Sequence, residues 1–171
     1  DVTNAYHVDA LKRSLQGVSL NVLINNAGVL TNETLEDLSF ERIQKQFDVN
    51  ALGPLRVTHA LLDNLKAGSK VAIISSRMGS LGDNTSGSRY GYRMSKAAIN
   101  MAGVSLSHDL KPKGVPVAIL HPGLVSTGMT GFTAHGIPPE EAAAGLLRRI
   151  DDLNIDNSGT FWHQNGDVLP W

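Results

Sequence analysis

The sequence predicts an α/β protein with a parallel β-sheet that is covered by helices on both faces. Three short apolar runs do not alternate with polar residues, which is typical of strands buried on both sides. Longer segments with an apolar residue about every 3.6 positions separate these runs. Strands and helices that alternate at this spacing form βαβ units with right-handed crossovers. The length of 171 residues predicts one domain that spans residues 1–171.

The predicted strands are rich in β-branched residues and are bounded by glycine or polar residues. They cover residues 21–25 (NVLIN), 70–75 (KVAIIS) and 115–120 (VPVAIL), and a weaker run covers residues 160–162 (TFW). The segment 79–91 is rich in Gly, Ser and Asn and lies between a strand and a helix. We therefore expect it to be a loop.

Helical periodicity fills the intervals between the strands. The last helix follows Pro138 and Pro139, and proline suits the first turn of a helix because an N–H there would have no partner. Gly53 and Pro54 interrupt the second helix. The predicted helices are, in order, a short stripe at Val8, Leu11 and Leu15, then residues 35–65, 90–110 and 140–153.

Composition and charge exclude several classes of protein. Fifteen Lys and Arg against sixteen Asp and Glu leave no basic surplus for binding nucleic acid or an anionic membrane. The absence of cysteine excludes a disulfide scaffold, a Cys-ligated zinc site and a cysteine nucleophile. The six histidines show no metal-ligand spacing, so no metal site is expected. No apolar run approaches the ~20 residues of a membrane helix and no signal segment opens the chain, so we expect a cytoplasmic protein.

The chemistry of the protein is expected just after the strands. In open parallel sheets, ligands bind beyond the carboxyl ends of the strands. Three segments occupy such positions: Asn25-Asn26-Ala27-Gly28, Ser75-Ser76-Arg77-Met78-Gly79 and His121-Pro122-Gly123.

Tyr92 and Lys96 lie four positions apart near the start of a predicted helix, so their side chains share one face. A nearby cation stabilises a phenolate, and we expect Lys96 to lower the pKa of Tyr92 from about 10. A tyrosine tuned in this way can give or take a proton at physiological pH. The spacing also arises by chance on many helices, so it is weak alone. Tyr90 has no lysine four residues on and is expected to pack or to line the entrance to the substrate site.

Several such signals occur together, and the set resembles the short-chain dehydrogenase/reductase family of the classical type. The resemblance covers essentially the whole chain and rests on Asn25-Asn26-Ala27-Gly28, Asn50, Ser76, Tyr92 with Lys96, and Pro122-Gly123 followed by Thr127. Residues 75–80 and 159–171 resemble the C-factor-like or carbonyl-reductase-like subgroup. The resemblance implies a doubly wound, Rossmann-type sheet. It also implies an NAD(P)-dependent oxidoreductase that transfers hydride between nicotinamide and a carbonyl or alcohol substrate.

The resemblance assigns catalytic roles to four residues. Tyr92 is the general acid in reduction or the general base in oxidation. Lys96 depresses the pKa of Tyr92 and forms a hydrogen bond with the nicotinamide ribose. Ser76 bonds the substrate carbonyl oxygen. Asn50 supports a water in a proton relay to the lysine. Ser75 is the alternative to Ser76, because alternation would point the two hydroxyls to opposite faces; alignment with the motif favours Ser76.

The resemblance also implies a cofactor site, with NADP slightly favoured over NAD. Thr127 would bond the nicotinamide carboxamide, and Asn25 and Gly28 would hold the sheet edge near the ribose. Asp1 opens a short DVT stretch whose aspartate contacts the adenine in the family. The implied cofactor-binding residues are Asp1, Asn25, Ala27, Gly28, Tyr92, Lys96, Pro122, Gly123, Val125 and Thr127.

One feature near Asn50 follows from the residues alone. Pro54 has no N–H, so it cannot close the helical bond back to the carbonyl of Asn50. That carbonyl can then hold a water. A simple kink at Gly53-Pro54 explains the sequence equally well, and the two interpretations are compatible.

The Gly-rich turn with which the family opens, TGxxxGxG, has no counterpart in the sequence. Asp1-Val2-Thr3 matches a stretch that normally follows the third strand of the sheet order 3-2-1-4-5-6-7. We therefore expect an N-terminally truncated sheet with strand order 4-5-6-7. The strand at 21–25 would be an exposed apolar edge. This exact chain would bind the cofactor weakly or not at all.

Rival functions and partners complete the expectations. A cofactor-binding regulatory protein on the same fold, or an inactive fragment, is the alternative to an enzyme. Members of the family form homodimers or tetramers, often through the two long helices, here at about 36–66 and 90–110. The segment 125–139 should cap a small-molecule substrate. Its Met129, Phe132 and Ile137 suggest an apolar carbonyl compound.

Overall fold

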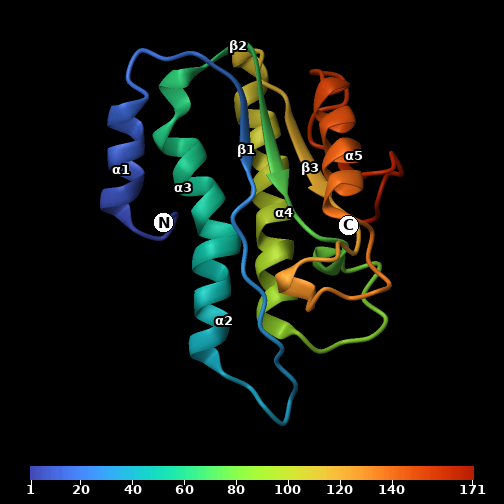
Figure 1. The fold of residues 1–171 in the computed structure, drawn as a ribbon. Helices are drawn as coiled ribbons and strands as arrows, with labels where there is room; N and C mark the ends of the chain where they lie inside the picture. Colours follow the sequence, from blue (N-terminus) through green and yellow to red (C-terminus); the bar gives the residue numbers. More distant parts are fainter.

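Four parallel strands form one sheet in the computed structural model, which describes all of residues 1–171. The strands are β1 (Leu20–Asn25), β2 (Leu65–Ile74), β3 (Val117–His121) and β4 (Phe161–His163). They lie side by side in chain order, β1-β2-β3-β4, and Figure 1 labels the first three of them. This order confirms the predicted arrangement 4-5-6-7. Because every pair is parallel, all carboxyl ends lie at one edge of the sheet.

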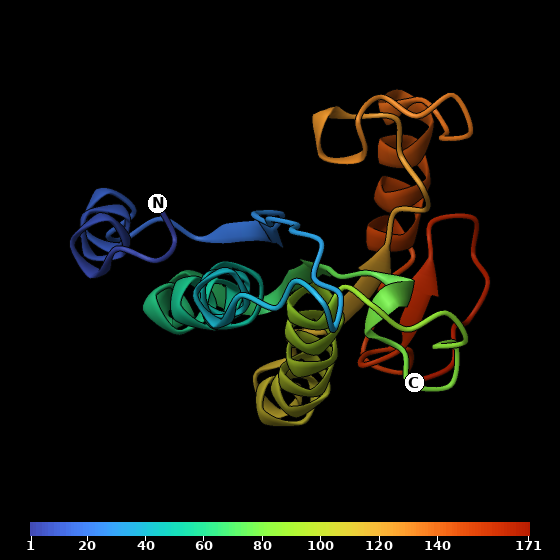
Figure 2. The same cartoon turned by 90° about the horizontal axis from the view of Figure 1, so that it is seen from below.

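Helices cover both faces of this sheet. They are α1 (Ala5–Ser14), α2 (Phe40–Phe47), α3 (Gly53–Ala60), α4 (Tyr90–Leu110) and α5 (Pro139–Asp151). Seen along the sheet, α2, α3 and α4 lie on one face and α5 on the other (Figure 2). The layers are those of a doubly wound α/β fold. None of the helices combines the length and the apolar character needed to cross a membrane.

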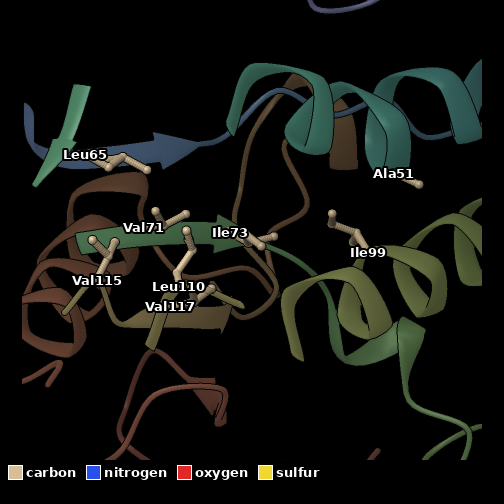
Figure 3. Close-up of a cluster of buried hydrophobic side chains, with 8 residues drawn as sticks. All are labelled: Ala51, Leu65, Val71, Ile73, Ile99, Leu110, Val115 and Val117. Atoms are coloured by element: carbon tan, nitrogen blue, oxygen red, sulfur yellow. The ribbon is translucent and has the colours of Figure 1, made fainter. Parts of the chain in front are cut away.

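The core is divided by the sheet into two main clusters. Neighbouring residues of a strand point to opposite faces, so Val71 and Ile73 face α4 whereas Ala72 faces α5. The larger cluster, between the sheet and α4, comprises Ala51, Leu65, Val71, Ile73, Ile99, Leu110, Val115 and Val117 (Figure 3). The cluster under α5 comprises Ala72, Ala118, Leu120, Ile150 and Leu153. Strands buried on both faces explain the apolar runs in the sequence.

Helix α4 approaches the sheet closely at Gly103. A Cβ atom at this position would lie 2.6 Å from Cγ1 of Ile119 on β3. The missing side chain therefore lets the helix rest directly on the central strands. Helix α4 begins and ends at the predicted residues, 90 and 110. Its first turns carry Tyr92 and Lys96, so this contact also sets their height above the sheet edge.

The segment predicted as one helix over residues 35–65 differs in two ways. Helix α2 begins only at Phe40, because the hydroxyl of Ser39 accepts a hydrogen bond from the N–H of Arg42 at 3.3 Å and caps it. A π-helical turn (Asp48–Leu52) then connects α2 to α3. The N–H of Gly53 donates to the carbonyl of Asp48 across this wider turn. Pro54 falls in the first turn of α3, so the helix widens at the predicted interruption.

Strand β1 forms one edge of the sheet, as predicted. Val22 and Ile24 remain 37% and 45% exposed, so an apolar stripe of this strand faces outward. Strand β2 begins at Leu65, earlier than predicted, because Leu65 pairs with Leu20 before the register shifts. The hydroxyl of Ser69 donates to the carbonyl of Leu20 at 2.6 Å within this irregular stretch.

Truncation of Ile119 tests the contact between α4 and the sheet. Its side chain is fully buried against Gly103. We expect Ile119→Ala to lower the free energy of unfolding by about 2–5 kcal/mol and Ile119→Val by about 1 kcal/mol, because the larger cavity loses more contacts. Urea denaturation followed by circular dichroism measures both. An alanine variant as stable as the valine variant would contradict this packing.

Candidate active site

Two adjoining cavities open at the carboxyl edge of the sheet. Cavity A has a volume of about 770 Å³ and cavity B one of about 690 Å³. Both volumes suit small-molecule ligands. Cavity A extends toward Asn32 and Arg89, and cavity B extends under Gly28 and the start of α5. The two share the residues Ser76, Tyr92, His121, Gly123, Met129 and Thr130.

Tyr92 lies at the junction of the cavities, on the first turn of α4. Burial raises the pKa of its phenol above the usual 10.0, while hydrogen bonding with Ser76 and the charge of Arg89 act in the opposite direction. Burial is the largest of these effects because it disfavours the charged phenolate. Tyr92 therefore carries its proton throughout the neutral pH range.

Lys96 lies one turn further along α4 and is 4% exposed. Its ammonium donates to the carbonyl of Ile74 at 2.9 Å and lies 5.7 Å from the centre of the Tyr92 ring. Burial lowers the pKa of Lys96 to about 8. The expected lowering of the Tyr92 pKa is wrong for this structure, because the net shift is upward. The ammonium stands over the ring face and binds a strand carbonyl, and burial of the phenol dominates.

Asn50 lies in the π-helical turn and is 1% exposed. Its Oδ1 accepts from the N–H of Val29 at 2.8 Å, and its Nδ2 donates to the Val29 carbonyl at 2.8 Å and to Oγ of Ser95 at 3.0 Å. A Cβ atom at Gly28 would lie 3.5 Å from Asn50 Oδ1 and 3.8 Å from Lys96 Nζ. The side chain thus ties the loop after β1 to α4 beside the lysine. The relay role of Asn50 stays a prediction.

The two serines at the end of β2 have different surroundings. The hydroxyl of Ser75 is buried and donates to Oδ1 of Asn100 on α4 at 2.5 Å. Ser76 lines both cavities beside Tyr92, and its Oγ also accepts from the N–H of Met78 at 3.1 Å. Ser75 lines cavity B as well, but its hydroxyl is already bonded to Asn100, so these surroundings favour Ser76 for contact with a ligand.

Most of the expected cofactor contacts lie together in cavity B. Those that line it are Ala27, Gly28, Tyr92, Lys96, Pro122, Gly123, Val125 and Thr127. Asn25 does not line it, because its Nδ2 donates to the Thr58 hydroxyl at 3.0 Å and turns the amide toward α3. Asp1 lies outside as well, with its carboxylate accepting from the backbone N–H and the hydroxyl of Thr3 at 2.8 Å each.

Sequence reasoning named the strand-end segment that contains His121 but missed His163 and Arg89 as lining residues. His121 and His163, at the ends of β3 and β4, stand edge to face with ring centres 5.1 Å apart. Burial, with the charges of His163 and Arg77, lowers the pKa of His121 to about 3, so this ring is neutral. The strand-end rule could have found His163. Arg89 lines cavity A from the loop before α4, and no pattern in the sequence marks it.

The segment after β3 reaches the site only in part. Met129 lines both cavities, whereas Phe132 and Ile137 line neither. Phe132 is 74% exposed, and Ile137 closes the base of the loop through a bridge to Val125. Only one of the three residues that suggested an apolar substrate therefore faces these cavities.

Comparison with known proteins agrees with this arrangement. The model of the short chain dehydrogenase family matches residues 1–137. The "1-hydroxy-2-glutathionyl-2-methyl-3-butene dehydrogenase" of Rhodococcus sp. (strain AD45) is 46% identical over 177 residues, covering 100% of this chain and 78% of the relative. The "C-signal" protein of Myxococcus xanthus is 48% identical over 155 residues, covering 89% of this chain and 93% of the relative.

Among solved structures, the NADPH-bound carbonyl reductase from chicken fatty liver superposes with a TM-score of 0.92. It is 30% identical and covers 100% of this chain and 75% of its own. The match over most of the chain, together with the tyrosine, lysine and serine at the sheet edge, establishes the family. The chain belongs to the short-chain dehydrogenase family and is an oxidoreductase.

Proposed function

We propose that the protein interconverts carbonyl compounds and alcohols, with Tyr92 giving or taking the proton. One observation carries this proposal: the phenol of Tyr92, the hydroxyl of Ser76 and the ammonium of Lys96 gather where two cavities meet. Cavity B would hold the cofactor and cavity A the substrate. The reacting carbonyl would then lie at the boundary, beside Ser76 and Tyr92.

The residues of cavity B fit the nicotinamide half of the cofactor. An ammonium has three N–H donors, and Lys96 uses one of them on the carbonyl of Ile74. The other two are available to ribose hydroxyls. Ala27 and Gly28 line the same cavity and leave room beside the lysine. NADP or NAD supplies the hydride when bound.

The side chains at the junction suit the proton transfer. The raised pKa keeps Tyr92 protonated, so its phenol can donate to a carbonyl oxygen that gains negative charge. The Ser76 hydroxyl can donate a hydrogen bond to the same oxygen, which stabilises the developing charge. The Lys96 ammonium, 5.7 Å from the ring centre, stabilises the negative charge left on the phenolate. Asn50 holds the lysine's surroundings in place.

The relatives support this reaction class. One is named a dehydrogenase of a glutathionyl alcohol, and the chicken protein is a carbonyl reductase with NADPH bound, which favours NADP. The name of the "C-signal" protein states no reaction, so a regulatory function remains the alternative. A role that needs only cofactor binding would not depend on the phenolic hydroxyl.

Assembly into homo-oligomers through the long helices is also part of the proposal. Large apolar side chains are exposed on α2, α3, α4 and the π-helical turn: Phe40, Leu52, Leu55, Met94 and Met101. Such side chains are typical of surfaces that a partner covers.

Replacing Tyr92 by phenylalanine tests the proton donor. We expect Tyr92→Phe to reduce turnover of an aldehyde by about 10²–10⁴-fold and to leave NADPH binding within a few-fold of the wild type. Tyr90→Phe is the matched control, because Tyr90 lines neither cavity. Steady-state kinetics and fluorescence titration with NADPH measure both. Unchanged turnover in Tyr92→Phe would refute the proposal.

The neighbouring serines offer a second comparison. We expect Ser76→Ala to lower kcat by about 10²–10³-fold, because the substrate oxygen loses a donor. Ser75→Ala should keep kcat but lower the free energy of unfolding by about 1 kcal/mol, because the buried amide of Asn100 loses its partner. Kinetics and urea denaturation of each variant separate the effects. The reverse pattern would assign the catalytic hydroxyl to Ser75.

The pH profile should reveal Lys96. Its ammonium loses charge as the pH rises through about 8, whereas Tyr92 keeps its proton to above 10.0. We therefore expect kcat/KM for carbonyl reduction to be constant below about pH 8 and to fall above it. The reason is that kcat/KM reports the pKa values of groups in the free enzyme. Lys96→Arg stays charged and should move the fall to higher pH. A wild-type profile that is flat to about pH 10 would contradict this role.

A further inference from the structure

We propose that cavity A binds an anionic group of the substrate and that Arg89 holds it. The substrate class would then be carbonyl compounds that carry a carboxylate away from the reacting carbon. Calling the ligand a substrate rests on the proposed function. The anion site itself rests on the placement and the charge of Arg89.

Arg89 is held at the wall of cavity A by its neighbours. Its Nε donates to Oδ1 of Asn32 at 2.9 Å, and its Nη1 lies 3.7 Å from the sulfur of Met78. Its backbone N–H donates to the carbonyl of Glu33 at 2.7 Å. Nη2 has no hydrogen-bond partner within the protein. A guanidinium fixed on one edge and free on the other can offer donors to a carboxylate.

The charge of Arg89 is not neutralised by the protein. Five of the eight arginines have a carboxylate within 4.0 Å, and Arg89, Arg93 and Arg148 have none. No Asp or Glu lines cavity A. Arg77, the other arginine of this cavity, is paired with Asp83 at 2.5 Å. Arg89 is therefore the unpaired cation of the cavity.

The carboxylate of Glu33, whose backbone carbonyl accepts from the Arg89 N–H, is unavailable to the Arg89 side chain. This carboxylate is fully buried and accepts from the Thr31 hydroxyl, from Nε2 of Gln46 and from the backbone N–H of Gly91. Arg42 lies 3.7 Å from the same carboxylate. The Glu33 carboxylate thus holds the start of α4, and the Arg89 guanidinium remains available to a ligand.

The backbone before α4 is strained. Ser88 and Arg89 have φ angles of 56° and 52°, in the left-handed region that favours glycine. Two consecutive residues of this kind persist only where the surroundings hold them. Here the bond from Arg89 N–H to Glu33 and the bond from Gly91 N–H to the Glu33 carboxylate do so. In this conformation Arg89 lines cavity A.

The anion belongs to the substrate side of the site. Cavity B contains no arginine, and its lysine stands beside Gly28. Arg89 lines cavity A and not cavity B, although both cavities share Ser76 and Tyr92. The charge of Arg89 also acts to lower the pKa of Tyr92. An anion bound to Arg89 would offset that charge.

The test compares 4-carboxybenzaldehyde with its neutral methyl ester. Isothermal titration calorimetry of the 171-residue protein should show about tenfold tighter binding of the carboxylate. The preference should shrink as salt is added. Arg89→Asn should abolish it while folding at least as well, because asparagine tolerates the left-handed conformation. Arg89→Lys keeps the charge and should retain part of it.

Arg148→Gln is the matched control, because it removes a positive charge that lines neither cavity. It should keep the full preference. Equal binding of the two probes by the wild type, or a preference that survives in Arg89→Asn, would overturn the proposal. Equal losses in Arg89→Asn and Arg148→Gln would overturn it too, since they would indicate only a general effect of net charge.

Turnover of the same two aldehydes with NADPH separates this inference from the proposed function. Binding that prefers the carboxylate, without reduction of either aldehyde, would keep the anion site and refute the carbonyl reductase. If wild type and Arg89→Asn each reduced the two aldehydes with equal kcat/KM, the proposed reductase activity would stand and the anion site would be refuted.

Discussion

The close packing of α4 against the central strands is the constraint on which the site depends. The helix can rest on β3 because Gly103 presents no side chain to Ile119, and the apolar cluster around Ile73 and Ile99 holds it there. Gly103 lies about two turns from Lys96 and about three from Tyr92, and a helix is rigid over this length, so the contact also sets where both residues lie relative to the strand ends. The geometry of the candidate site is therefore a consequence of core packing, although neither side chain belongs to the apolar core.

The site keeps buried polar groups that a purely structural core would not contain. An ammonium at the place of Lys96 is costly, and its lowered pKa expresses that cost. The carbonyl of Ile74 satisfies only one of its donors, while Asn50 and Ser95 form a bonded network beside it. Perturbed ionisable groups of this kind concentrate at functional sites. Burying the Lys96 ammonium beside the Tyr92 phenol therefore costs the protein some folding stability.

Two cavities with different chemistry meet at that point. Cavity B combines small residues with one lysine, whereas cavity A carries arginines and the histidine pair. Ser76 and Tyr92, which are among the residues shared by both, lie at the boundary where two bound molecules would touch. This division lets one wall evolve toward the substrate while the other serves the cofactor.

The sequence by itself determined the strands, the limits of α4 and the segments at the strand ends, because hydrophobic periodicity and turn residues are local patterns. The resemblance added the strand order and the candidate residues. Only the tertiary structure decided that Ser39 begins α2, that Asn25 turns toward α3 and that Arg89 stands unpaired in a cavity. It also reversed the expected direction of the Tyr92 pKa shift. Hydrogen bonds between side chains and the burial of side chains away from water depend on how close two segments lie in space. When those segments are far apart in the sequence, no local pattern records that distance.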